Sequence, residues 1–180
     1  MPISEYLKTL RAKIGRDLVM LPAACVAIID DQGRLLLGKE AETGLWVLPG
    51  GALDPNERPA DGAIRECFEE TGLLIEITGL IGVFGGPEFL VRYPNGDECY
   101  YISTAFRGTV INKSGVSSDG ELTEIGYYSQ AEFERLATSP QTKLIVRTTF
   151  ANSNVPFFQP PTYSAVNLEN ILHQTKKDLG

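Results

Sequence analysis

Three glutamates lie close together in the segment GALDPNERPADGAIRECFEETGL, residues 51–73. If residues 59–71 form a helix, Glu66, Glu69 and Glu70 have the spacing i, i+3, i+4 and share one helical face. Like charges on one face repel one another, so the face is either fully solvated or arranged to receive cations. Hard divalent cations such as Mg²⁺ prefer oxygen ligands, typically one or two carboxylates with waters and substrate phosphates. Composition alone does not choose between these interpretations.

The apolar side chains of residues 59–71 also follow a helical period. They form a stripe roughly opposite the acidic face, made of Ala60, Ala63, Ile64, Cys67, Phe68 and Thr71. Gly62 lies on the acidic face one turn before Glu66, where the missing side chain leaves room for another segment to approach the backbone. Pro59 in the first turn favours a helix start there, although Arg58 before it is a poor capping residue.

The spacing of the charged residues resembles the signature of the Nudix hydrolase family, G-x5-E-x7-R-E-U-x-E-E-x-G-U, where U is a bulky aliphatic residue. The matching residues are Gly51, Glu57, Arg65, Glu66, Glu69, Glu70, Gly72 and Leu73. Cys67 stands where an aliphatic residue is usual, and this departure is conservative because cysteine behaves as a small buried hydrophobe. The resemblance also covers the strands on both sides of the signature, over residues 20–130 approximately.

This resemblance implies a fold, a reaction and a metal. The expected fold class is α/β, an α/β/α sandwich around a mixed β-sheet. The expected reaction is hydrolysis of the pyrophosphate linkage in a nucleoside diphosphate joined to another group. The resemblance implies dependence on Mg²⁺ or Mn²⁺, bound by Glu66, Glu69, Glu70 and the backbone carbonyl of Gly51. Bound metal neutralises anionic phosphate oxygens and lowers the pKa of an attacking water.

The resemblance also assigns catalytic roles around the metal. Glu66 is counted among the catalytic residues as well as the ligands, Arg65 is expected to orient a glutamate, and Glu57 is expected to be a supporting carboxylate. The alternative for Arg65 and Glu57 is an ordinary ion pair on the helix surface, which contributes little energy.

A proton acceptor outside the metal cluster is also expected, because a cation lowers the pKa of the carboxylates that bind it. The single histidine, His173, is remote from the signature. The stretch SSDGELTEIGYYS resembles the loop that supplies an extra carboxylate in some family members, and Glu121 is our candidate base. Residues 113–121 are rich in Ser and Gly and are typical of a mobile loop. The alternative is that Glu121 is a solvated loop charge.

Substrate contacts are less well marked in the sequence. Trp46 precedes LPGG and is a candidate wall of the nucleoside pocket, although a lone strand tryptophan is more often part of the core. Pro87 is near the position of a proline associated with ADP-ribose hydrolases of the family. The expected substrate is a small nucleotide such as ADP-ribose or a nucleoside triphosphate, and the family resemblance suggests a homodimer.

Composition limits the other partners. The 180 residues carry a net charge of −7, with a sequence pI near 4.8, which argues against binding to a nucleic-acid duplex or an anionic membrane. No apolar run is long enough to span a membrane, and no signal segment opens the chain. Three cysteines without paired spacing do not suggest a disulfide framework, so a cytoplasmic location is expected.

A non-catalytic protein of the same fold is the alternative function. Nudix-fold sensors bind a nucleotide sugar without cleaving it, and they tend to have lost signature glutamates or gained a DNA-binding domain. This chain keeps the glutamates and has no basic patch, so the hydrolase interpretation is favoured.

The remaining elements indicate one domain over residues 1–180. We expect an amphipathic helix at about residues 3–17 and a C-terminal extension at about 152–180, irregular over 152–163 and helical over 164–177. Between them, the pattern predicts a hairpin of strands 23–30 and 34–40, a hairpin turn at Asn95-Gly96, a short strand over 124–129, and helices over 130–138 and 142–151.

Overall fold

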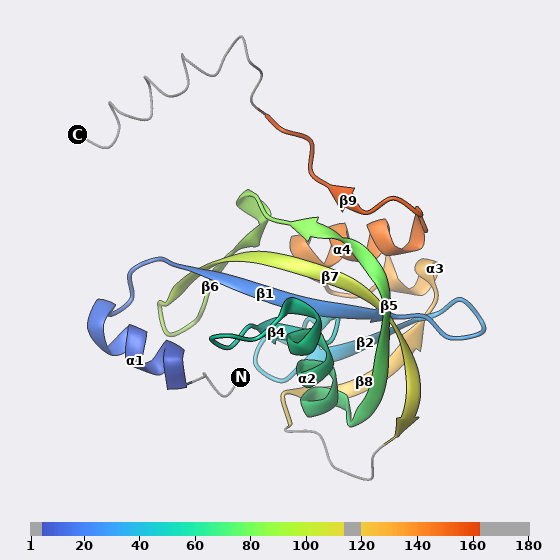
Figure 1. Cartoon of the computed structure of the whole chain (residues 1–180), viewed down its shortest axis with the longest axis horizontal. Helices are drawn as coiled ribbons and strands as arrows, with labels where there is room; N and C mark the ends of the chain where they lie inside the picture. The colour runs from blue at the N-terminus through green and yellow to red at the C-terminus, as the bar shows by residue number, and fades with distance from the viewer. Residues whose placement is uncertain (1–4, 114–119, 163–180) are drawn as a thin grey trace.

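The computed structural model describes residues 5–113 and 120–162, in which strands and helices are interleaved along the chain (Figure 1). The helical elements are α1 (Glu5–Ile14), α2 (Pro59–Thr71), the 3₁₀ turn η1 (Pro87–Phe89), α3 (Gln130–Phe133) and α4 (Pro140–Phe150). The strands are β1 (Val19–Ile28), β2 (Leu35–Glu40), β3 (Trp46–Val47), β4 (Gly50–Ala52), β5 (Leu73–Phe84), β6 (Leu90–Arg92), β7 (Glu98–Lys113), β8 (Leu122–Tyr128) and β9 (Phe157–Phe158).

Two sheets form the frame of the fold. Within the described residues, a six-stranded sheet has the order β4-β1-β7-β5-β9, with β6 paired to β7. β1 runs parallel to β7 and β9 runs parallel to β5, whereas the other pairs are antiparallel. The smaller sheet, β3-β2-β8, is antiparallel. The prediction of a mixed sheet is therefore confirmed.

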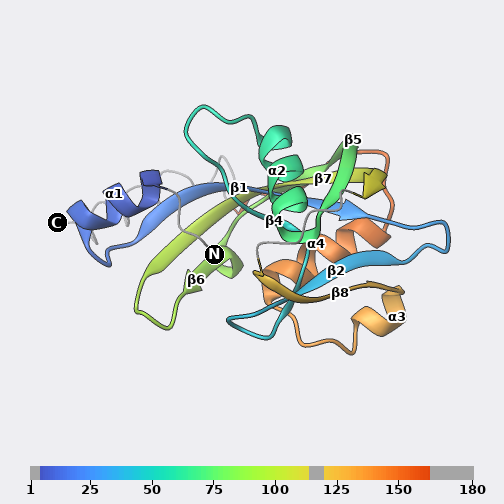
Figure 2. The same ribbon diagram turned by 90° about the horizontal axis from the view of Figure 1, so that it is seen from below.

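Helices cover both faces of the larger sheet (Figure 2). On one face, Ala63 and Cys67 of α2 are buried against Val26 and Ile28 of β1. The core on the opposite face joins α3 and α4 to β1 and β2 and includes Cys25, Ala27, Leu35, Leu37, Phe133, Ile145 and Val146. Successive side chains of β1 enter different cores because side chains alternate along a strand. The α/β/α arrangement around a mixed sheet is confirmed.

The predicted hairpin of strands 23–30 and 34–40 is wrong as a sheet pairing. Ile29 and Leu35 form a single antiparallel bridge, after which β1 enters the larger sheet and β2 enters the smaller one. β1 is instead paired with β7 along its whole length. A run of apolar residues predicts each strand but does not predict which strand it pairs with. Both strands are buried on two faces, so their sequences show no alternation that would distinguish one pairing from another. The turn at Asn95-Gly96 is confirmed, since Arg92 of β6 lies opposite Glu98 of β7.

The C-terminal part also differs from expectation. Residues 157–158 form β9 beside Gly82 and Val83, within a stretch that was predicted to be irregular. The helix predicted over 130–138 is shorter than expected. α3 starts at a capping box formed by Ser129 and Glu132, but it ends at Phe133. The predicted helix over 164–177 and most of the predicted loop over 113–121 lie outside the described residues. A single domain over all 180 residues stays a prediction.

The N-terminal helix is confirmed over residues 5–14 and packs on the end of the larger sheet. Its Leu7, Leu10 and Ile14 contact a cluster formed by β1 and β7. Arg11 of the same helix donates hydrogen bonds to the carbonyls of Asp17 and Glu98, at 2.6 and 2.8 Å. These contacts fix α1 against the sheet, away from the signature helix (Figure 1). In the part of the chain that the structure describes, no helix is long and apolar enough to cross a membrane.

Candidate active site

The signature segment forms strand β4, a loop over residues 53–58 and helix α2. The helix has the predicted bounds, 59–71, with Arg58 at the N-cap making no side-chain capping bond and Pro59 at the first position. Gly72 ends the helix in the left-handed region, with φ 68°, and its N–H donates to the Phe68 carbonyl at 2.8 Å. Local sequence therefore fixes both ends of the helix that carries the glutamates.

Two of the three signature glutamates are buried, although they lie on the helical face away from the apolar stripe. Glu66 is 8% exposed and Glu70 is 4% exposed, whereas the side chain of Glu69 is 46% exposed. β4 covers the buried pair, and the Gly50 N–H donates to Glu70 Oε2 at 3.0 Å. Burial of two carboxylates costs free energy unless protein donors or cations compensate their charge.

Gly51 is required because the Glu66 carboxylate lies against its backbone. A Cβ atom at this position would be 2.7 Å from both Cδ and Oε1 of Glu66 and 2.8 Å from Oε2. The structure therefore leaves no room for a side chain at Gly51 beside the Glu66 carboxylate.

We expect Gly51→Ala to lower kcat by about 10²-fold, because the added methyl group displaces the Glu66 carboxylate. Stability should fall by about 1–3 kcal/mol, the usual cost of an overpacked site. Steady-state kinetics and thermal unfolding measure the two effects. Gly79→Ala in β5 is the matched control, since a Cβ atom at Gly79 meets no atom within 4 Å. Equal activity of the two alanine variants would contradict the close approach at Gly51.

Arg65 links three carboxylates of the signature. Its guanidinium binds Glu57 in a bidentate manner, with Nε to Oε1 at 2.8 Å and Nη2 to Oε2 at 2.9 Å. Nη1 donates to Oε1 of Glu66 at 2.8 Å and to Oε2 of Glu69 at 3.0 Å. Nη2 also donates to the Ala52 carbonyl at 3.2 Å. This geometry exceeds a plain surface ion pair, because one planar group holds the loop, β4 and the helix together.

The carboxyl groups around Arg65 have different electrostatic environments. Hydrogen bonds from Arg65 hold the pKa of Glu57 below its ordinary value. Burial raises the pKa of Glu66, with the charges of Glu69 and Glu121 acting in the same direction and Arg65 opposing them. A positive charge brought to Glu66 would therefore relieve an unfavourable environment.

We expect Glu57→Gln to lower the free energy of unfolding by about 1–3 kcal/mol at pH 7, the usual value of hydrogen bonds to a charged group. Because the folded-state pKa of Glu57 is depressed, this stabilisation is complete above the unfolded carboxyl pKa of about 4.3 and is lost as the pH falls through the folded-state value. Denaturant unfolding at several pH values, with chelator, measures it. A difference that persists unchanged at low pH would refute the ion-pair origin, and Glu88→Gln on exposed η1 is the control.

An acidic cavity of about 430 Å³ opens beside Gly50. Four carboxylates are among its lining residues, from Glu40, Glu42, Glu70 and Glu121, and the lining includes no Lys or Arg among the described residues. Glu121 is half-buried, and its backbone carbonyl accepts a hydrogen bond from the Ala41 N–H at 2.9 Å. The structure thus brings the candidate base to the same cavity as Glu70, although the two are distant in sequence.

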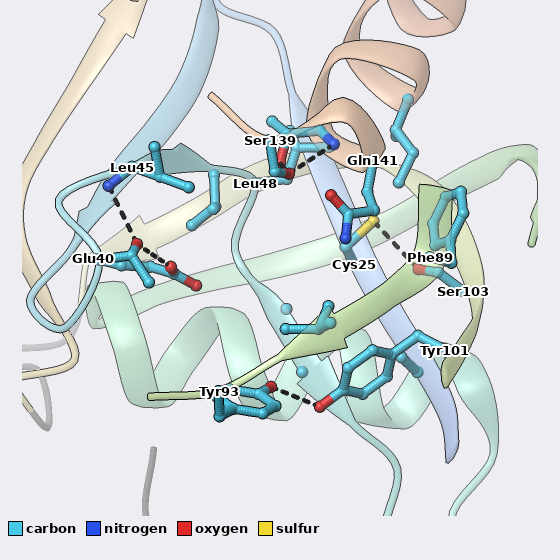
Figure 3. Close-up of a pocket in the computed structure, with 18 of the residues that line it drawn as sticks. Cys25, Glu40, Leu45, Leu48, Phe89, Tyr93, Tyr101, Ser103, Ser139 and Gln141 are labelled. Carbon is cyan, nitrogen blue, oxygen red and sulfur yellow. Dashed lines mark hydrogen bonds between the residues drawn. The ribbon is translucent and has the colours of Figure 1, made fainter. Parts of the chain in front are cut away.

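A second, mostly apolar pocket of about 260 Å³ adjoins the acidic cavity, and the two share Glu40, Thr43, Gly50 and Tyr93 (Figure 3). Its walls include Leu45, Leu48, Phe89, Tyr101 and Ile145. The hydroxyls of Tyr93 and Tyr101 are hydrogen-bonded at 2.7 Å. Burial raises the pKa of the Cys25 thiol in this pocket to about 12, so the thiol is not a nucleophile at neutral pH.

Neither proposed substrate contact lines these two cavities. Trp46 is buried in the core, where its ring meets Tyr128 edge-on at 4.8 Å between centroids. Pro87 is exposed and starts η1, and the residue of η1 that lines the apolar pocket is Phe89. The structure favours a packing role for Trp46 and a role for Pro87 in turning the chain toward Phe89.

Sequence reasoning missed most of the residues that line the two cavities. Glu40 ends β2 and Glu42 follows it, Tyr93 lies in the β6–β7 turn, and Gln141 lies in the first turn of α4. No local motif marks them. The one available signal is their type, because acidic, aromatic and amide side chains at the ends of strands and helices are common in binding sites.

The chemistry of the candidate ligands, Glu66, Glu69, Glu70 and the Gly51 carbonyl, suits a hard divalent cation. All candidate ligands are oxygens, and burial raises the pKa of Glu66, so an added positive charge would favour its ionised form. Over residues 5–113 and 120–162, however, no three acidic, cysteine or histidine side chains converge closely enough to hold a metal as they stand. Arg65 donates a hydrogen bond to one carboxylate oxygen of Glu66 and to one of Glu69. Mg²⁺ typically takes only one or two carboxylates together with waters and phosphates, and Glu69 is the most exposed of the three glutamates.

The fold and the site together define the class of this protein. It is an α/β/α sandwich with a mixed sheet that carries an acidic loop–helix segment. The chain belongs to the Nudix hydrolase family, because the sequence model of the NUDIX domain matches residues 20–148. An ADP-ribose pyrophosphatase of Methanocaldococcus jannaschii is 33% identical over 128 residues, which cover 69% of this chain and 68% of that protein.

Other relatives match over a shorter region. A MutT-like protein of Streptomyces ambofaciens is 44% identical over 57 residues, covering 32% of this chain and 37% of that protein. A diphosphoinositol polyphosphate phosphohydrolase 2 of Mus musculus is 34% identical over 64 residues, covering 34% and 36%. The chain thus spans little more than a third of the length of these two relatives.

Solved structures agree on the fold. A Nudix hydrolase from Nitrosomonas europaea superposes with a TM-score of 0.63 at 21% identity, over 81% of this chain and all of that chain. A MutT protein from Methanosarcina mazei gives a TM-score of 0.59 at 23% identity, over 77% and 99%. At such identities the likeness concerns the fold alone.

Proposed function

We propose that this protein is a metal-dependent hydrolase that cleaves the pyrophosphate linkage of a nucleoside diphosphate joined to another group. The observation that carries this proposal is the acidic cavity beside an apolar pocket, with Gly50 in both linings. Water attacks one phosphorus, the bridging P–O bond breaks, and the products are a nucleoside monophosphate and the phosphorylated second group. One proton of the water passes to a protein base.

The protein residues have separate roles in this proposal. Glu57 holds Arg65, and Arg65 holds the carboxylates of Glu66 and Glu69 in place. This fixed arrangement favours catalysis because the groups need little reorganisation during the reaction. Glu121, which lines the cavity with Glu70, accepts the proton of the attacking water.

A divalent cation, Mg²⁺ or Mn²⁺, would be held by Glu66, Glu69, Glu70 and the carbonyl of Gly51. When bound, it neutralises phosphate charge and lowers the pKa of water. The charges around the cavity support a requirement for a cation. Four carboxylates are among its lining residues, and no described lining residue is basic, so the cavity would repel a pyrophosphate that carried no cation.

The proposed substrates are small nucleotides, ADP-ribose or a nucleoside triphosphate. The relative that matches two thirds of this chain is an ADP-ribose pyrophosphatase, which makes ADP-ribose the first substrate to test. The apolar pocket suits the nucleoside end and the acidic cavity suits the phosphates with their cations. A cytoplasmic location and a homodimer stay predictions.

The test is product formation from a panel of ADP-ribose, nucleoside triphosphates and dinucleoside polyphosphates, with Mg²⁺, with Mn²⁺ and with chelator. We expect turnover of at least one compound that requires the cation and yields a nucleoside monophosphate. Tight binding of a nucleotide with no turnover under any condition would overturn the proposal and would favour a sensor.

A further inference from the structure

One residue that lines the apolar pocket carries a polar atom that the protein does not satisfy. Gln141 lines the pocket, and its Oε1 is buried without a hydrogen-bond partner. The other such side-chain atom in the described residues, Thr138 Oγ1, belongs to a residue that does not line the pocket. Because buried polar atoms in folded proteins are nearly always hydrogen-bonded, an unpaired amide oxygen in a pocket wall indicates a ligand contact.

The position of Gln141 is fixed by the start of α4. Ser139 is the N-cap, and its Oγ accepts a hydrogen bond from the Thr142 N–H at 3.2 Å. Pro140 occupies the first helical position, where its fixed φ favours the helix. Only the side-chain torsions of Gln141 remain adjustable, and the last of them is broad for glutamine. In Figure 3 the Gln141 side chain extends from α4 toward the pocket, so rotation about its side-chain torsions presents Oε1 to a ligand there.

The size of the pocket limits what it binds. At about 260 Å³ it is smaller than the range of roughly 300–1,000 Å³ that is usual for whole small-molecule ligands. It therefore accommodates one ring system rather than a complete nucleotide. Leu48 and Ile145 supply apolar contacts, and Phe89 supplies an aromatic ring. Gly50 lies at the junction with the acidic cavity, which places the phosphate end of a ligand on that side.

Resting on the proposed function, we propose that this pocket takes the nucleobase of the substrate and that Gln141 selects a base with an exocyclic amine beside an unprotonated ring nitrogen on its Watson–Crick edge, as in adenine and cytosine. Oε1 accepts an N–H of the amine, and Nε2 donates to the neighbouring ring nitrogen. Paired contacts of this kind are how glutamine recognises adenine elsewhere. The amine supplies the partner that Oε1 lacks, whereas a base with neither the amine nor a ring N–H on that edge leaves the acceptor unsatisfied.

The test is calorimetric binding of nucleosides, which carry no phosphate and so need no cation to enter. Adenosine is compared with purine riboside, and cytidine is compared with pyrimidin-2-one riboside, because each of these analogues lacks the amine and keeps the ring nitrogen. We expect the amine-bearing member of at least one pair to bind about 10- to 100-fold more tightly to the wild-type protein, the usual effect of leaving a buried acceptor unpaired. Gln141→Leu should abolish this difference by weakening the amine-bearing nucleoside alone.

Gln141→Met is the second variant, for use if the leucine variant unfolds, because its side chain is unbranched and has a similar length. Gln130→Leu is the matched control, since Gln130 is exposed and lines neither cavity. Equal binding within both nucleoside pairs, no nucleoside binding, or an amine preference that survives in a folded Gln141 variant would overturn the proposal. Binding is measured without turnover, so an inactive protein that keeps the preference would refute the hydrolase function and leave this assignment intact.

Discussion

Replacement of Glu70 by glutamine is expected to lower kcat by at least about 10³-fold while the protein stays folded. Glu70 is 4% exposed and accepts the Gly50 N–H at Oε2. Glutamine keeps the size and an acceptor oxygen for that hydrogen bond, so the local structure should survive. The lost charge is the one proposed to hold the cation, and loss of the water that this cation positions costs several kcal/mol of barrier.

The measurement is kcat at saturating Mg²⁺, together with thermal unfolding of both proteins. Glu76→Gln is the control, because Glu76 is an exposed glutamate of β5. A kcat close to that of the wild type would remove Glu70 from the ligand set. A large fall in melting temperature alongside the loss of activity would instead assign Glu70 a structural role.

Replacement of Glu121 by glutamine is expected to lower kcat by about 10²- to 10⁴-fold, the usual range for a positioned general base. Glu121 lines the acidic cavity with Glu70, and its negative charge contributes to the raised pKa of Glu66. It immediately precedes β8, outside the helix that carries the expected ligands. A carboxylate that is not bound to the cation remains a better proton acceptor. Stability should change little.

The pH dependence of kcat separates this role from simple binding. Loss of the base should flatten the acidic limb of the pH–rate profile, whereas a binding defect would raise KM and leave that limb in place. Glu124→Gln is the control, because Glu124 is an exposed residue of β8 paired with Lys39 at 2.7 Å. Wild-type behaviour of the Glu121 variant, with failure of the Glu124 or Glu66 variant, would place the base elsewhere.

The sequence by itself determined the elements that depend on local information. The bounds of the signature helix, 59–71, follow from the helical period, from Pro59 at its start and from Gly72 at its end. Asn95-Gly96 predicted the β6–β7 turn because only a few residue types adopt the left-handed backbone there, and Gly96 has φ 88°. The glutamates and Arg65 were found from spacing within one short segment.

Tertiary structure decided which residues are buried and which meet. Helical spacing placed Glu66 and Glu70 on an acidic face away from the apolar stripe, but β4 and its glycines cover that face and bury both side chains. Spacing also does not reveal that Arg65 binds Glu57 across the loop. These outcomes depend on how β4 pairs with β1, a contact between segments more than twenty residues apart.

The same reason explains the strand partners and the cavities. An apolar pattern identified β1 and β2 as strands, but the choice between a hairpin and two different sheets depends on the ladder between β1 and the distant β7. Glu121 was found only through a resemblance, and Gln141 was not found, because each reaches its cavity from a remote segment. A binding pocket is a property of packing between distant segments, and local propensity carries no information about it.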